Sequence, residues 1–171
     1  MKLLYLFIFL NVHNIKHLDF TKNQNTNQQI DESFLFRPLI NYKSALLAVK
    51  KSNKKLFIYF TSYGSVNSIR MEEDSFTNLE VKLLLDKNYV CFKAYLDDQT
   101  AIPINDQYVS KALNKKVKTV GEKFQDLQLT KFKDNRQPHF LIIDKNEKVI
   151  RQVIGYQNKK EFISFLKIGG K

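Results

Sequence analysis

The feature that most constrains this chain is an apolar run over residues 54–61 that leads into Gly64-Ser65-Val66-Asn67-Ser68. Aromatic residues enrich the run, which predicts a β-strand. The Ser-x-x-Ser opens a helical segment that continues through Arg70-Met71-Glu72. Two residues at the start of a helix, three positions apart, have the spacing of a Cys-x-x-Cys pair, and here both are serines.

A second signal lies further along the chain, where Gln137-Pro138-His139 opens another apolar run. Proline is tolerated at the first residue of a strand, and about one X-Pro bond in twenty is cis in folded proteins. Helical spacing and apolar runs alternate in the rest of the chain. They predict helices over residues 41–51 and 79–85, strands over 89–96, 140–143 and 149–154, and a last helix with Phe162, Phe165 and Leu166 buried.

In this order the segments resemble the thioredoxin superfamily, and more closely the periplasmic C-terminal domain of DsbD-type thiol:disulfide interchange proteins. The resemblance covers roughly residues 42–168 and implies an α/β thioredoxin-like fold, with a central mixed sheet and helices on both faces. It rests on Phe60-Thr61-Ser62-Tyr63-Gly64, Val66-Asn67, Arg70-Met71-Glu72-Glu73, Tyr95-Leu96-Asp97-Asp98, residues 121–132, Gln137-Pro138 and Val153-Ile154-Gly155-Tyr156.

The resemblance implies that Ser65 and Ser68 stand at the positions of the two redox cysteines. A serine hydroxyl is hardly ionised at neutral pH and forms no mixed disulfide, so the chain as written is expected to be inert in dithiol exchange. Serine is also a preferred N-cap residue. A hydrogen bond from the N–H of Ser68 or its neighbour to the Ser65 side chain would stabilise the helix by about 1 kcal/mol.

The family pattern also keeps a buried acid six residues before the first redox position, where this chain has Tyr59. Joint loss of the acid and the cysteines favours natural loss of activity over an experimental Cys-to-Ser change, and both explanations stay open. Glu72 still matches the family pattern. The alternative is that it is an ordinary exposed residue on the helix surface with no part in the site.

Two other side chains of the chain are chemically reactive, His139 and Cys91. His139 is the one candidate base for a serine nucleophile, but alternation along a strand is expected to turn its ring away from the loop. Cys91 is the single cysteine of the chain and lies in the middle of a predicted strand, where a thiol acts as a small hydrophobic group. We therefore expect neither a serine hydrolase nor a redox centre at Cys91.

The resemblance implies a substrate groove beside the Ser-x-x-Ser loop. In active relatives the residue before the cis-proline pairs with the extended backbone of the substrate, a mode of strand addition that needs no thiol. Binding can therefore survive the loss of catalysis. The groove residues implied are Tyr63, Gly64, Ser65, Val66, Gln137, Pro138 and the turn at Gly155, with Glu72 nearby.

The first functional hypothesis is an exported, redox-inactive thioredoxin-like protein that binds a protein or peptide partner, with a membrane redox protein among the candidates. The second is a protein-disulfide reductase domain seen as a Cys-to-Ser variant, which leaves the enzymatic status open. The third places the interaction in the segment 99–120 and leaves the groove vestigial.

The chain is predicted to hold one domain, residues 41–171, of ordinary domain size. Residues 1–20 begin Met1-Lys2 followed by a short apolar block, which is typical of a secretory signal and too short to span a bilayer. This predicts a periplasmic or otherwise exported protein, although residues 11–20 contain no small-x-small cleavage site. Residues 21–40 include an Asn/Gln/Thr-rich stretch and are predicted to be a linker.

The net charge of +11 comes mainly from lysines dispersed among acidic residues, which indicates a solvated surface. The densest cluster, Lys111, Lys115, Lys116 and Lys118, suits an acidic partner or a peripheral contact with an anionic membrane. No nucleic-acid-binding motif accompanies it. One cysteine and three scattered histidines do not have the spacing of a zinc site, so no metal, no cofactor and no nucleic acid are expected.

Overall fold

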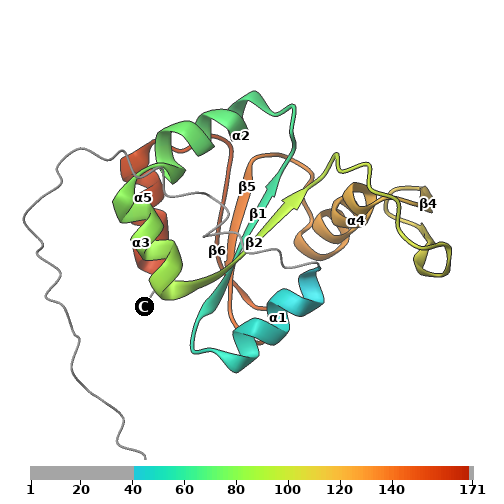
Figure 1. Cartoon of the computed structure of the whole chain (residues 1–171), viewed down its shortest axis with the longest axis horizontal. Helices are drawn as coiled ribbons and strands as arrows, with labels where there is room; N and C mark the ends of the chain where they lie inside the picture. The colour runs from blue at the N-terminus through green and yellow to red at the C-terminus, as the bar shows by residue number, and fades with distance from the viewer. Residues whose placement is uncertain (1–40, 170–171) are drawn as a thin grey trace, which may run out of the picture.

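The computed structural model describes residues 41–169 of the chain, and within this range the protein is a three-layer α/β structure (Figure 1). The predicted signal segment 1–20, the predicted linker 21–40 and residues 170–171 lie outside the described residues.

The central layer is a mixed sheet of four strands in the order β2-β1-β5-β6. Strand β1 (Lys55–Thr61) pairs in parallel with β2 (Tyr89–Tyr95) and antiparallel with β5 (His139–Ile143), which pairs antiparallel with β6 (Val149–Ile154). Strands β1 and β5 are almost entirely buried, as continuous apolar runs predict for strands covered on both faces.

The register brings four strand termini to one end of the sheet. Phe60, near the end of β1, lies opposite His139 at the start of β5, and His139 lies opposite Ile154 at the end of β6. Because β2 runs parallel to β1, its carboxyl end lies there too. The loop after β1 and the residues before β5 therefore meet at this end.

Helices α1 (Tyr42–Lys51) and α4 (Val120–Phe132) cover one face of the sheet. Helices α2 (Val66–Met71), α3 (Leu79–Asn88) and α5 (Lys159–Gly169) cover the other (Figure 1). Alternate residues of β1 serve two separate cores. Phe57 and Tyr59 pack with the α2–α3–α5 layer, whereas Ile58 and Phe60 pack with α1 and α4. The predicted central mixed sheet with helices on both faces is confirmed.

Two segments differ in detail from the sequence-based expectation. Helix α2 is short and continues as a π-helical turn, η2 (Glu72–Phe76). The connecting segment 99–120 holds a 3₁₀ turn, η3 (Ile104–Asp106), and a hairpin of β3 (Tyr108–Ser110) and β4 (Lys115–Val117). Strands of three residues are too short to show an alternating pattern, which is why the sequence did not reveal the hairpin.

Candidate functional site

The loop after β1 is fixed against the end of β2. The backbone N–H of Tyr63 donates to the Asp97 carboxylate at 3.1 and 3.0 Å. The Tyr63 ring stacks on Tyr95, with 4.0 Å between ring centroids and 8° between planes. Tyr63 remains 61% exposed. The loop therefore presents an aromatic side chain from a defined position.

Ser65 and Ser68 are hydrogen-bonded to each other at the start of α2. Ser65 is the N-cap, and its Oγ accepts from the N–H of Ser68 at 3.3 Å, so the predicted capping role is confirmed. The Ser68 hydroxyl also donates to Ser65 Oγ at 2.8 Å. Ser68 is buried and Ser65 half-buried. The two side chains thus face each other, as a dithiol pair would, but they carry no redox chemistry.

A polar cluster lies directly beneath these serines. The Tyr59 hydroxyl donates to Glu72 Oε1 at 3.1 Å, accepts from Thr61 Oγ1 at 3.1 Å and lies 3.4 Å from the carbonyl oxygen of Ser68. Lys93, paired with Tyr59 across β1 and β2, places its Nζ 2.8 Å from Glu72 Oε1. Glu72 is therefore turned inward beneath the loop and is not solvated helix surface.

The electrostatics of this cluster keep Tyr59 neutral and Lys93 charged. Burial is the main cause that raises the pKa of Tyr59, and the nearby Glu72 carboxylate raises it further. Burial alone would lower the pKa of Lys93, but hydrogen bonds and charge interactions with Glu72 and Tyr95 outweigh it and leave that pKa above its ordinary value. The Glu72 carboxylate thus lies between the Tyr59 hydroxyl and the Lys93 ammonium group.

The roles of Lys93 and Asp97 in this site were not predicted from the sequence. Lys93 is the one charged residue within the predicted strand 89–96 that is otherwise largely apolar, and this was the available signal. Its partner could not be inferred, because the contact depends on the register between β1 and β2 and on the direction of Glu72.

The other predicted groove residues lie at the same end of the sheet. The Gln137–Pro138 peptide bond is cis, and the carbonyl oxygen of Pro138 accepts from the N–H of Gly155 at 2.8 Å. Gly155 has a φ of 84°, a left-handed conformation that favours glycine. Gln137 Oε1 is buried and has no hydrogen-bond partner within residues 41–169. It is an acceptor that the fold leaves unsatisfied.

Exposed apolar residues lie near Ser65 in the sequence, on both sides of it. Val66 is 76% exposed, and Ile69 follows it by three residues on the same face of α2. Tyr63, on the other side of Ser65, is exposed as well. Gly64, between Tyr63 and Ser65, has open space where a side chain would lie.

His139 belongs to the opposite face of the sheet. Its Nδ1 lies 3.1 Å from the Gln128 Nε2 donor, and its Nε2 lies 3.2 Å from Gln152 Oε1, which fits a neutral ring with its proton on Nε2. Burial is the main cause that lowers its pKa. The expected orientation away from the loop is confirmed, because the ring packs against Phe60 and α4.

Cys91 is a buried free cysteine in β2, as expected for a small hydrophobic group, and burial raises its pKa to about 12. Residues 41–169 bring together no group of three metal-ligating side chains. Within the same range we find no helix with the length and apolar character needed to cross a membrane.

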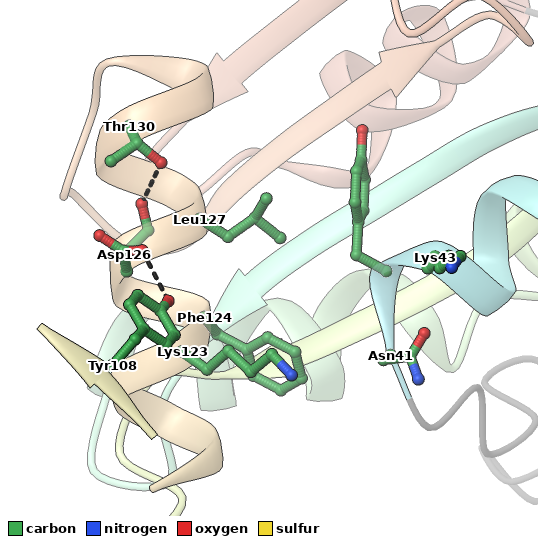
Figure 2. Close-up of a pocket in the computed structure, with 9 residues that line it drawn as sticks. Asn41, Lys43, Tyr108, Lys123, Phe124, Asp126, Leu127 and Thr130 are labelled. Atoms are coloured by element: carbon green, nitrogen blue, oxygen red, sulfur yellow. Dashed lines mark hydrogen bonds between the residues drawn. The ribbon is translucent and has the colours of Figure 1, made fainter. Parts of the chain in front are cut away.

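A cavity of about 380 Å³ lies away from the serine loop, between the start of α1 and α4 (Figure 2). Phe124 and Leu127 contribute apolar lining, and Lys43 and Lys123 border it. None of the predicted site residues lines this cavity.

The mixed sheet, the helix capped by the loop after β1 and the proline before β5 define a protein of the thioredoxin-like class. The family model of the thioredoxin-like domain matches residues 42–169, and the chain belongs to this family. The serines at positions 65 and 68, with Cys91 as the only cysteine, mean that it lacks the Cys-x-x-Cys pair.

Solved structures with similar folds include several disulfide oxidoreductases. A DsbH oxidoreductase is 17% identical, with a TM-score of 0.58 over 75% of this chain and 81% of that chain. The oxidised DsbD C-terminal domain of Neisseria meningitidis is 12% identical, with a TM-score of 0.51 over 73% and 89%. A disulphide isomerase of Xylella fastidiosa is 11% identical, with a TM-score of 0.53 over 88% and 96%. At such identities the likeness is one of fold. A comparison with curated proteins gave no match.

Proposed function

We propose that this protein binds an extended polypeptide at the end of the sheet formed by the Tyr63 loop, Gln137 and Pro138, without thiol chemistry. The observation that carries the proposal is the hydrogen bond that the Ser68 hydroxyl donates to Ser65 Oγ at the cap of α2. The loop and helix cap retain the conformation that would present a dithiol, but the side chains at positions 65 and 68 carry hydroxyl groups instead of the thiols that exchange disulfides.

The surface around the serines suits a peptide backbone with apolar side chains. Tyr63 and Val66 are largely exposed, and aromatic side chains are frequent anchors in protein interfaces. Gln137 precedes Pro138, the position from which the resemblance implies strand addition to a bound chain. Its side-chain Oε1 is buried, so in this proposal it is the backbone of Gln137 that meets the bound chain.

We place this activity outside the cytoplasm. The support is the apolar block of residues 3–10 after Lys2 and the resemblance to DsbD-type domains of the periplasm. One candidate partner in that compartment is the exposed part of a membrane redox protein.

Replacing Tyr63 or Gln137 with alanine is expected to weaken polypeptide binding about fivefold or more, because Tyr63 is an exposed aromatic anchor and the partly buried Gln137 side chain positions the backbone that pairs with the bound chain. The probe is reduced, carboxymethylated α-lactalbumin, which is unfolded and has no free thiol, and the readout is its dissociation constant by interferometry. Leu47→Ala is the matched control, since Leu47 is an exposed apolar residue of α1 on the other face. If Tyr63→Ala, Gln137→Ala and Leu47→Ala all bound the probe with the same affinity, the polypeptide would not bind at the proposed groove.

A second candidate is a disulfide interchange domain with serines at its cysteine positions. The observation in its favour is the 2.8 Å separation of the Ser65 and Ser68 hydroxyl oxygens, which shows that side chains at these positions can reach each other.

For this candidate, the Ser65→Cys/Ser68→Cys double variant is expected to form an internal disulfide and to catalyse insulin reduction by dithiothreitol. The single variants Ser65→Cys and Ser68→Cys are the controls, because neither has a resolving thiol at the site. Turbidity measures turnover, and intact mass measures disulfide formation. A folded double variant that forms the disulfide but shows no turnover would leave polypeptide binding as the function.

A further inference from the structure

The β3–β4 hairpin has an inner face that is held against α4. The Tyr108 hydroxyl donates to Asp126 Oδ2 at 2.6 Å, a bond that Figure 2 shows, and Ser110 Oγ donates to the other carboxylate oxygen. Lys115 Nζ lies 3.1 Å from Glu122 Oε1. Two acidic residues of α4 thus fix one side of the hairpin to the body of the protein.

The outer face of the hairpin follows from the alternation of side chains. Val109 and Lys116 are cross-strand neighbours, and each lies between residues that face α4, so both point away from it. Ser110 and Val117 on the inner face are buried, whereas Val109 is 73% exposed. Lys118, two residues after Lys116, continues the outer row, and its side chain is exposed.

The lysines of this segment differ in whether they form an ion pair with an acidic side chain. Lys115 is neutralised by Glu122. Lys111, Lys116 and Lys118 are exposed, and no acidic side chain within the described range 41–169 forms an ion pair with them. Three uncompensated cations therefore lie at the outer face and tip of one short hairpin.

Exposed aliphatic side chains occur in the same segment, and one of them, Val109, is the cross-strand neighbour of Lys116. Ile104, in the turn just before β3, is 80% exposed, and Val109 lies on the outer face itself. Lysines alone would suit any acidic partner. Exposed aliphatic groups beside lysines are the combination that binds an anionic lipid surface, because the cations attract the headgroups while the aliphatic groups enter the interface.

We propose that the outer hairpin face, defined by Val109, Lys111, Lys116 and Lys118, binds an anionic lipid bilayer. The hairpin lies beyond α4, on the side of the molecule away from α2 and its serines (Figure 1). Binding to a bilayer through this face leaves the groove at Tyr63 and Gln137 free, so this role does not depend on the function proposed above.

The test is cosedimentation of the full chain with vesicles of phosphatidylcholine containing phosphatidylglycerol, with pure phosphatidylcholine vesicles as the reference. The K111Q/K116Q/K118Q variant is expected to bind the anionic vesicles about a hundredfold more weakly, since each lysine near such a surface contributes about fivefold. The affinity of the unchanged protein should fall with added salt. Residues 3–10 are apolar but unchanged in every variant, so the comparison isolates the hairpin.

The matched control is K87Q/K159Q/K160Q, which removes the same charge from exposed lysines of α3 and α5. It is expected to retain most of the binding. Equal losses in both triple variants would show attraction by net charge alone and would overturn the proposal. A V109S variant is expected to bind severalfold more weakly than the unchanged chain. Full retention of binding by V109S, together with equal binding to polyglutamate, would assign the face to acidic polypeptides instead.

Discussion

Replacing Gly121 with alanine is expected to destabilise the protein by roughly 4 kcal/mol or more, at the extreme end of single substitutions. A Cβ atom at this position would lie 2.6 Å from both Asp98 N and Leu96 O, and 2.8 Å from Asp98 O. All three are backbone atoms, so no side-chain rotation can relieve the overlap. Gly121 is also hydrogen-bonded through its N–H to Asp98 O at 2.9 Å, which ties the start of α4 to the chain leaving β2.

Urea unfolding followed by circular dichroism measures this effect. Gly64→Ala is the control, because nothing lies within 4 Å of a Cβ at Gly64 and the free energy of unfolding should change by no more than about 1 kcal/mol. Similar midpoints for the two alanine variants would contradict the close approach between α4 and the end of β2.

Replacing Glu72 with methionine is expected to cost about 3 kcal/mol of stability. The Lys93 side chain is only 9% exposed, and without the carboxylate its cation would remain largely buried after losing the ion pair with Glu72. Breaking buried pairs costs about 3–5 kcal/mol, and the partial exposure of Glu72 places this pair at the low end. The double variant Glu72→Met/Lys93→Met is expected to regain most of the loss, because no charge is then left inside.

The measurement is a double-mutant cycle of unfolding free energies at neutral pH. Lys167→Met is the control, since its ion pair with Glu80 is more than half exposed on both sides and should contribute less than about 1 kcal/mol. A Glu72→Met variant that loses no more stability than this control would show that the cluster beneath the serines is solvated.

The central elements could be predicted because their burial leaves a clear trace in the sequence. Strands such as β1 and β5 are covered on both faces and therefore form continuous apolar runs. Helix α3 was also predictable as a helix, yet Leu79 and Leu83 lie on its exposed side. Local spacing indicates the type of an element, but which apolar side chains are buried depends on the neighbours that the fold supplies.

At the site, too, contacts between residues close in sequence could be predicted, whereas contacts between distant segments could not. The cap at Ser65 involves residues three positions apart, so the sequence was sufficient to predict it. The position of Glu72 depends on Lys93 and Tyr59, which lie on two different strands and meet only through the sheet register. Sequence analysis could therefore locate the loop but not the ion pair beneath it.

The hydrogen-bonded serines at the cap of α2 also bear on how long a bound polypeptide would stay. With hydroxyls at both positions and the only thiol of the chain buried in β2, no covalent intermediate joins protein and ligand. Release is then governed by a dissociation rate alone. Occupancy of the groove would follow partner concentration and would be the same in oxidising and reducing surroundings.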